Sequence, residues 1–268
     1  MRGPAGTGPI RAAWDSGRII RWALGWGGLV IVVVSFVRLG LSPAAIAEAV
    51  RDIFPYLAGM FPPDLVTNLG PHLRLLGETL WMALAATALG MVLALPVGIL
   101  AARNATVHPL AALVCRGLTI VVRGIPDLLL AILFVVAVGL GPLAGVLALT
   151  IGAIGFTGKL IADAIEDTDL SRQDEAMRAV GASWLQRTVS STIPTAFPAI
   201  IGVGLFTFDV YVRSATIMGI VGAGGIGLAL DASIRGRQLN QTLALILMVF
   251  VVVYLTERFS GWLRKHAI

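Results

Sequence analysis

Long apolar segments recur along this chain, separated by shorter polar connections. Six of them have about the 20 residues that an α-helix needs to cross the hydrocarbon of a bilayer. Buried strands are excluded because they run for only about 4–8 residues. The pattern therefore predicts six transmembrane helices, at approximately residues 21–40, 78–102, 120–140, 143–164, 199–220 and 242–262.

The spacing of these helices divides the chain into three parts. Residues 1–41 hold a tail and the first helix, which we expect to be retained because the apolar run lacks a small-x-small cleavage site. Residues 42–74 are less apolar and form an extracytoplasmic linker, where residues 44–58 can make an interfacial amphipathic helix. Residues 75–268 hold the other five helices. The fold class is an all-α integral membrane protein with a five-helix core and an added N-terminal helix.

Composition and charge agree with a membrane protein. Charged residues make up only 13% of the chain and hydrophobic residues 57%, whereas soluble domains carry about 25% charged residues. The net charge of +5 needs no nucleic-acid partner, because most Lys and Arg fall in segments on one side of the membrane. The positive-inside rule places that side, with both termini, in the cytoplasm. The single cysteine, Cys115, excludes an intrachain disulfide.

A charged segment, residues 165–195, interrupts the apolar pattern. Its charges cost about 2.5–3.5 kcal/mol each at a bilayer centre, so the segment lies outside the membrane. Ser171 and Asp174 have the spacing of a capping box, Gly181 permits a bend, and residues 182–192 can form a second helix. The prediction is a short helix braced at an elbow and rooted in the next membrane helix. The alternative is an amphipathic helix lying on lipid headgroups.

The residues of this segment resemble a known motif. Glu175-Ala176, with Gly181 and Ile193-Pro194, is similar to the Glu-Ala-Ala…Gly…Ile-x-Leu-Pro loop of ABC-importer permeases, a superfamily of binding-protein-dependent inner-membrane components. Met177 and Thr192 depart from that pattern. The resemblance implies a type I importer core whose loop inserts into a separate ATPase subunit. The residues expected to couple to that ATPase are Asp174, Glu175, Ala176, Met177, Arg178, Gly181 and Ala182.

The resemblance extends from about residue 78 to the C-terminus. Arg123-Gly-Ile-Pro126 looks like the Arg-x-Ile-Pro element of the family, and residues 209–227 are similar to its phosphonate branch. It implies a permease for phosphonate or a related phosphorus oxyanion (phosphate, phosphite) in a prokaryotic inner membrane. The implied partners are a second copy, two ABC ATPase subunits that bind ATP and Mg, and an extracytoplasmic binding protein. Methionine-like solutes stay open.

A glycine-rich run follows the fifth predicted helix. Its spacing formally matches a dinucleotide-binding fingerprint, but it follows an apolar helix and lacks the acidic residue about 20 positions on. Glycines at the end of a membrane helix permit close helix contact or an unwound turn that lines a cavity. We therefore expect either tight packing or an outer gate formed by Gly222, Gly224, Gly225 and Gly227.

Two ionisable residues lie within the fifth predicted helix. Asp209 and Arg213 are four positions apart, on one helical face. One interpretation is a pair that neutralises itself. The other is that Arg213 lines the translocation pathway and attracts an anion, since a guanidinium binds phosphate-like oxygens through paired hydrogen bonds.

No catalytic chemistry is expected on this chain. It lacks a Gly-x-x-x-x-Gly-Lys-Ser/Thr loop for ATP, and His72, His108 and His266 lack metal-ligand spacing. We expect no catalytic residue, metal or bound cofactor. A stand-alone secondary transporter or channel is the alternative, which would predict inverted repeats; the two halves show none. An intramembrane enzyme would need convergent polar residues in several helices.

Overall fold

The computed structural model describes residues 16–267, which are helical throughout apart from their connections. The chain divides into two compact units, residues 1–59 and residues 60–268. The first unit holds α1 (Ser16–Arg38) and α2 (Pro43–Ala58). The Ser42 hydroxyl caps α2 by accepting a hydrogen bond from the Ala45 N–H at 3.0 Å. The predicted helix at residues 44–58 is therefore present, and its position on a membrane surface stays a prediction.

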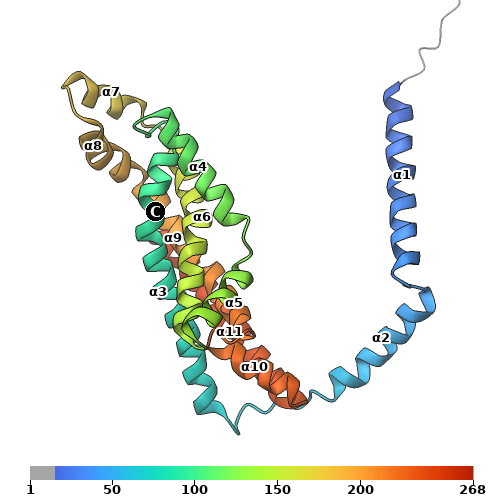
Figure 1. Ribbon diagram of the computed structural model, residues 1–268. Helices are drawn as coiled ribbons and strands as arrows, with labels where there is room; N and C mark the ends of the chain where they lie inside the picture. Colours follow the sequence, from blue (N-terminus) through green and yellow to red (C-terminus); the bar gives the residue numbers. More distant parts are fainter. Residues whose placement is uncertain (1–15, 268) are drawn as a thin grey trace, which may run out of the picture. The chain divides into compact units, whose positions relative to one another are not determined.

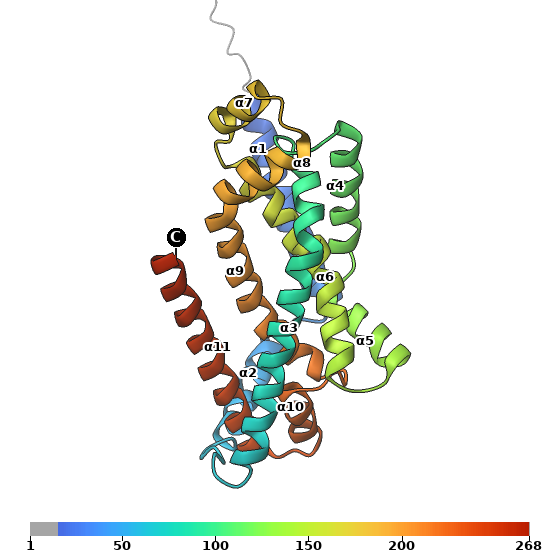
Figure 2. The ribbon, with the colours of Figure 1, turned by 90° about the vertical axis from the view of Figure 1, so that its left-hand side faces the viewer.

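The second unit is a helical bundle built around three long helices (Figures 1 and 2). These are α3 (Leu69–Ala101), α6 (Pro142–Glu166) and α9 (Ile193–Gly219). The other helices of the bundle are α4 (Pro109–Arg123), α5 (Asp127–Val138), α10 (Ile226–Arg235) and α11 (Leu239–Ala267). The connection from α6 to α9 contains α7 (Ser171–Ala179), α8 (Trp184–Arg187) and a π-helix, Thr188–Thr192.

Close contact between small residues holds α3 against α6. A Cβ placed on Gly98 would lie 2.6 Å from the Ile161 side chain, and a Cβ on Gly90 would lie 2.3 Å from the Ala153 Cβ. Such contacts let two backbones approach within a membrane, where packing replaces the hydrophobic drive of water. Larger side chains fill the centre of the bundle, including Met82, Leu149, Tyr211 and Met218.

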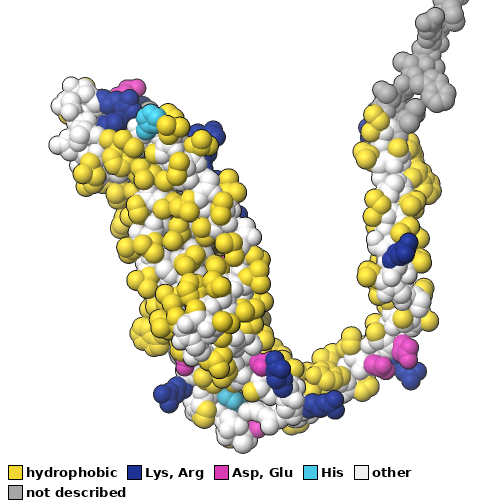
Figure 3. Space-filling model, in the orientation of Figure 1, with side chains coloured by type: hydrophobic (Ala, Val, Ile, Leu, Met, Phe, Trp, Pro, Cys, Tyr) yellow, Lys and Arg dark blue, Asp and Glu magenta, His cyan; other side chains and the backbone are white. Residues whose placement is uncertain are grey.

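The structure has the helices needed for six membrane crossings. Within residues 16–267, five helices are long and apolar enough to cross a membrane, and the number is six when the bent pair α4–α5 is counted as one crossing. On the face drawn in Figure 3, hydrophobic side chains cover the length of the bundle and charged side chains gather at its two ends. The prediction of an all-α membrane protein with six helical crossings is confirmed.

The third crossing differs from its prediction. A single helix at residues 120–140 was expected, but α4 ends at Arg123, α5 begins at Asp127, and the two axes are bent by 79°. The break falls at Gly124, Ile125 and Pro126. Proline lacks an N–H group and disfavours helical geometry in the residue before it. The prediction was wrong because an apolar run can continue through a break in the helix.

The break places the end of α4, at Arg123, beside the middle of α6. The Arg123 backbone nitrogen lies 2.8 Å from the point where a Cβ on Gly155 would stand, and Gly155 is near the middle of α6. Arg123 is the last residue of α4, and its side chain is exposed.

Candidate functional site at the α7–α8 elbow

Gly181 forms the turn of the elbow between α7 and α8. Its φ of +75° lies in the left-handed region that favours glycine. The Gly181 N–H donates to the Arg178 carbonyl at 2.9 Å, and the Ala182 N–H donates to the Met177 carbonyl at 3.0 Å. These two bonds are the pattern of a Schellman motif, which satisfies the last carbonyls of a helix. The bend predicted at Gly181 is therefore confirmed.

Helix α7 begins at Ser171, and Leu170 precedes it without a side-chain cap. The capping box predicted at Ser171 and Asp174 depends on the Ser171 side chain, which lies outside the described part of the structure, so it stays a prediction. A capping box is present on the other side of the elbow, at the start of α8. The Ser183 N–H donates to the Gln186 side chain at 2.8 Å, and the Gln186 N–H donates to the Ser183 hydroxyl. The reciprocal bonds fix the direction in which α8 leaves the turn.

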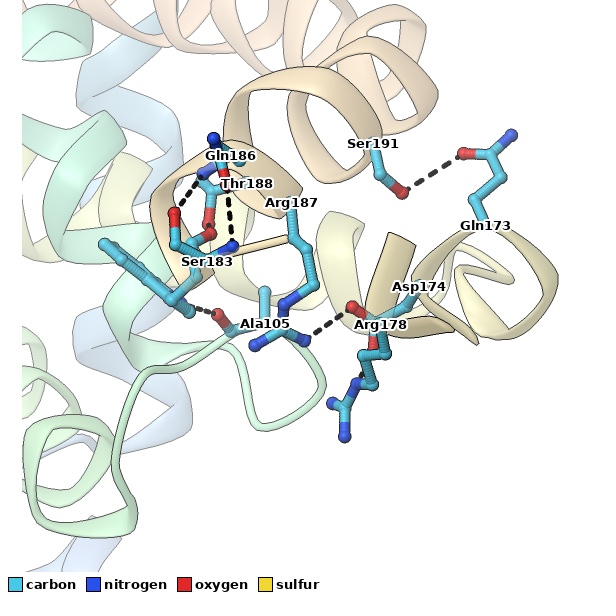
Figure 4. Close-up of polar contacts among 10 residues, drawn as sticks. Ala105, Gln173, Asp174, Arg178, Ser183, Gln186, Arg187, Thr188 and Ser191 are labelled. Atoms are coloured by element: carbon cyan, nitrogen blue, oxygen red, sulfur yellow. Dashed lines mark hydrogen bonds and ion pairs between the residues drawn. The ribbon is translucent and has the colours of Figure 1, made fainter. Parts of the chain in front are cut away.

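Asp174 braces the elbow from within (Figure 4). Its carboxylate accepts hydrogen bonds from Arg178 Nε and from Arg187 Nη1, each at 2.7 Å. Arg178 belongs to the same helix, whereas Arg187 belongs to α8. Burial raises the pKa of Asp174, but the hydrogen bonds and charges of Arg187 and Arg178 outweigh burial, so the pKa lies below its ordinary value. The two helices of the elbow are thereby joined through a carboxylate that is ionised at neutral pH.

A second contact ties α7 to the base of the elbow. The Gln173 side-chain oxygen accepts hydrogen bonds from the hydroxyls of Ser191 and Thr195. Ser191 lies in the π-helix and Thr195 in the first turn of α9. Both residues belong to one continuous helical segment, Trp184–Gly219, which consists of α8, the π-helix and α9. The elbow is thus the end of a membrane helix.

The predicted coupling residues lie on or near the surface of this elbow. Glu175, Ala176, Arg178 and Gly181 are exposed, and Asp174, Met177 and Ala182 are partly buried. Two apolar side chains outside the predicted coupling set stand among them, because Val180 is 78% exposed and Leu185 is 62% exposed. Large apolar residues within a charged segment that lies outside the membrane are the sequence signal that could have added them to the set. The surface offers charge and apolar area together.

The glycine run at the other end of the bundle is tightly packed. The Gly225 N–H donates to Glu78 Oε1 at 2.9 Å, and the Ile226 N–H donates to Thr79 Oγ1 at 2.9 Å. A Cβ on Gly219 would lie 2.6 Å from the Gly227 Cα, so α9 and α10 meet with their backbones in contact. Of the two expectations, tight packing is present at this run. The outer-gate role of Gly222, Gly224, Gly225 and Gly227 stays a prediction.

Asp209 and Arg213 do not form the pair that their spacing allows. The Asp209 carboxylate is 5% exposed and accepts a hydrogen bond from the Ser260 hydroxyl at 2.8 Å, with Arg264 Nη2 at 3.8 Å. Both partners lie on α11. Arg213 is exposed and has no ion pair with Asp209 within 4 Å. Asp209 therefore attaches α11 to α9, and the Arg213 guanidinium stays available.

Solved structures with the same fold define the class of protein. A chain from the inward-facing MetNI methionine ABC transporter aligns with a TM-score of 0.65 and 25% identity, over 74% of this chain and 96% of that one. An amino acid ABC transporter aligns with a TM-score of 0.59 and 20% identity. The fold is that of a type I ABC-importer membrane subunit.

The family follows from the sequence itself. Residues 94–267 match the family "binding-protein-dependent transport system inner membrane component". The chain belongs to this family of membrane permeases, as the resemblance of its charged segment indicated.

Two relatives of this chain are permeases of phosphate and phosphite transport systems. The phosphate-import permease PhnE of Mycolicibacterium smegmatis is 41% identical over 99% of this chain. This chain spans only 49% of that protein's length. The phosphite transport permease PtxC of Stutzerimonas stutzeri is 38% identical over 89% of this chain and 86% of its own length.

Proposed function

We propose that this chain is the permease subunit of an ATP-driven importer for a phosphorus oxyanion such as phosphonate, phosphate or phosphite. The observation that carries the proposal is the braced elbow, which is exposed at its tip and continuous with α9 at its base. A displacement at the tip must then move a membrane helix, because Asp174 and Arg187 resist bending at Gly181. Such an element is suited to receive force from another subunit.

The proposed source of that force is a cytoplasmic ABC ATPase. ATP and Mg bind to the ATPase, and this chain contributes the contact through Glu175 and its neighbours. Two copies of the chain, each with one elbow, form a pathway on two ATPase subunits, and an extracytoplasmic binding protein delivers the substrate. The elbow and both termini then face the cytoplasm of a prokaryote, in accord with the distribution of Lys and Arg.

Two observations support a phosphorus oxyanion as substrate. The relatives named above are a phosphate-import and a phosphite transport permease. Within the chain, Arg213 is an exposed guanidinium in a membrane helix, and Asp209 does not neutralise it directly. A cation within the membrane costs free energy, so such residues are rare and are candidates for a functional role. Guanidinium groups bind phosphate-like oxygens through paired hydrogen bonds.

Co-purification tests the coupling to an ATPase. The permease is expressed with the ATPase from its own transport system, and the Glu175→Lys variant is compared with Glu48→Lys, which makes the same charge change on the exposed surface of α2. We expect Glu175→Lys alone to weaken the association and ATP-driven uptake. A permease that binds no ATPase, or that transports without one, would support a secondary transporter or channel instead.

Competition in proteoliposomes tests the substrate. The complex takes up labelled phosphate in the presence of its binding protein, with phosphite, a small phosphonate, sulfate or methionine as competitor. We expect at least one phosphorus oxyanion to compete and both sulfate and methionine to fail. Uptake that responds to methionine alone would overturn the substrate assignment while leaving the importer mechanism intact.

A further inference from the structure

A tryptophan connects the elbow to a part of the bundle far away in sequence. The indole N–H of Trp184, the first residue of α8, donates to the Ala105 carbonyl at 2.7 Å. Ala105 is 8% exposed and lies in the loop between α3 and α4. The Trp184 ring also packs against the apolar cluster formed by the ends of α3, α6 and α9. The elbow therefore contacts the bundle at a point other than α9.

The loop that accepts this bond is itself held firmly. The Asn104 side-chain amide donates to the Ile165 carbonyl at 2.8 Å, and the Arg103 N–H donates to Glu166 Oε1 at 2.6 Å. Glu166 also forms an ion pair with Arg116 of α4. A loop anchored by side-chain and backbone bonds to its neighbours transmits a displacement instead of absorbing it.

Arg116 carries the connection into α4. Its Nε donates to the carbonyl of Ala101, the last residue of α3, at 2.8 Å, so the middle of α4 is fixed to the point where that loop begins. From there α4 runs to Arg123, where the third crossing breaks and bends by 79° before α5. A movement of α8 thus has two routes into the membrane. One passes along the continuous helix α9, and the other passes through Trp184 and Ala105 into α4 and the break.

We infer that Trp184 is a positioning residue that transmits the movement of the elbow to the broken third crossing. The inference rests on the proposed function, because it assumes that an ATPase moves the elbow. The bond couples α4 to α9, so that the two crossings shift together when the ATPase acts. Without it, α9 still moves, but α4 and α5 no longer follow.

Trp184→Phe tests the bond, since phenylalanine keeps much of the ring packing and removes the N–H donor. The permease is reconstituted with its ATPase and binding protein, and phosphate uptake and ATP hydrolysis are measured together. We expect hydrolysis to persist and phosphate transported per ATP to fall about five- to tenfold, the order of one lost hydrogen bond. The control is Trp81→Phe, because Trp81 is 71% exposed. If the phosphate transported per ATP equals that of the unmodified complex, the inference is overturned, even when uptake and hydrolysis are both slower.

A cross-link supplies an independent test by rescue. Trp184 and Ala105 are both replaced by cysteine in a Cys115→Ser background, which removes the single native thiol. We expect this variant to be uncoupled like Trp184→Phe, to recover uptake per ATP when a cleavable bifunctional thiol reagent joins the two positions, and to lose it again on reduction. A formed cross-link that leaves the ratio low overturns the inference. Absence of ATP-driven uptake by the unmodified complex would contradict the proposed function instead.

Discussion

Arg187 Nη1 lies 2.7 Å from Asp174 Oδ1 and joins two helices that the glycine turn at Gly181 would otherwise leave free to pivot. The ion pair spans 13 positions of sequence, from α7 to α8. Both side chains are largely covered, with 21% and 26% of their surfaces exposed. The stiffness of the elbow, and with it the proposed coupling to an ATPase, depends on this contact.

Asp174→Asn is expected to loosen the elbow without unfolding the protein. An ion pair that is still partly open to water contributes about 1 kcal/mol or less, so the melting temperature in detergent should change little. Amide hydrogen exchange in residues 171–187 should accelerate, and uptake per ATP should fall. Asp231→Asn is the matched control, since Asp231 pairs with Arg235 at the same 2.7 Å on α10. Equal exchange in both variants would show that Asp174 does not brace the elbow.

The elbow is expected to keep its stiffness through mildly acidic pH. The pKa of Asp174 is lowered in the folded protein because, although burial raises it, hydrogen bonds from Arg187 and Arg178 lower it further. A carboxyl whose pKa is lowered in the folded protein stabilises the fold fully at any pH above its pKa in the unfolded chain, about 3.9. This stabilisation is lost as the pH falls through the pKa of the folded protein. Hydrogen exchange of residues 171–187, corrected for intrinsic rates, should therefore be constant from pH 7 to 5. Loosening within that window would contradict the assignment.

Gly227→Ala is expected to destabilise the contact between α9 and α10. A Cβ at this position meets the Thr216 carbonyl and the Gly219 backbone, neither of which can rotate away. Overpacking of this kind costs about 1–3 kcal/mol, which should appear as a lower melting temperature. Gly77→Ala on α3 is the control, because a Cβ there meets no atom within 4 Å. Melting of Gly227→Ala at the control's temperature would show that the helices can separate.

Arg213→Ala is expected to reduce transport without affecting assembly. A hydrogen bond to a charged group contributes about 1.5–3 kcal/mol, so phosphate uptake should fall at least about tenfold. Melting should be unchanged because Arg213 has no ion pair with Asp209 within 4 Å. Arg213→Lys, which keeps the charge but loses the paired donors, should retain part of the uptake. Full uptake and unchanged anion selectivity in Arg213→Ala would remove it from the pathway.

Ser260→Ala is expected to weaken the attachment of α11. The substitution removes the hydroxyl that donates a hydrogen bond to the buried Asp209 carboxylate at 2.8 Å. A buried polar group that loses its hydrogen-bond partner costs about 1–3 kcal/mol of stability. Thr256→Ala on the same helix is the control, since Thr256 bonds only to the Val253 carbonyl one turn away. We expect thermal melting to fall further for Ser260→Ala. Equal melting of the two variants would assign Asp209 another role.

The membrane crossings and the elbow could be predicted because each has a local cause. A bilayer requires apolar runs of fixed length, and lipid excludes the charges around Glu175. The turn at Gly181 follows from the conformational freedom of glycine next to a helix. These features need no knowledge of what lies across the fold.

Features that depend on distant contacts could not be predicted. Trp184 binds the carbonyl of Ala105, 79 positions away, and a carbonyl gives no signal in sequence. Glu78 binds the glycine run across 147 positions. The expected pairing of Asp209 with Arg213 relied on spacing along one helix, whereas the partner that satisfies the carboxylate, Ser260, comes from another helix.

The π-helix at Thr188–Thr192 has a consequence for orientation. A π turn closes each hydrogen bond over five residues instead of four, so it holds one residue more than the α-helix on either side. One residue corresponds to roughly 100° of rotation about the helix axis. The direction of Leu185 around the helix axis is therefore rotated by roughly 100° from the direction it would have if α9 continued into α8 as a regular α-helix. Two permeases with the same docking residues, one with this extra residue and one without, would present faces of α8 about 100° apart to the same partner.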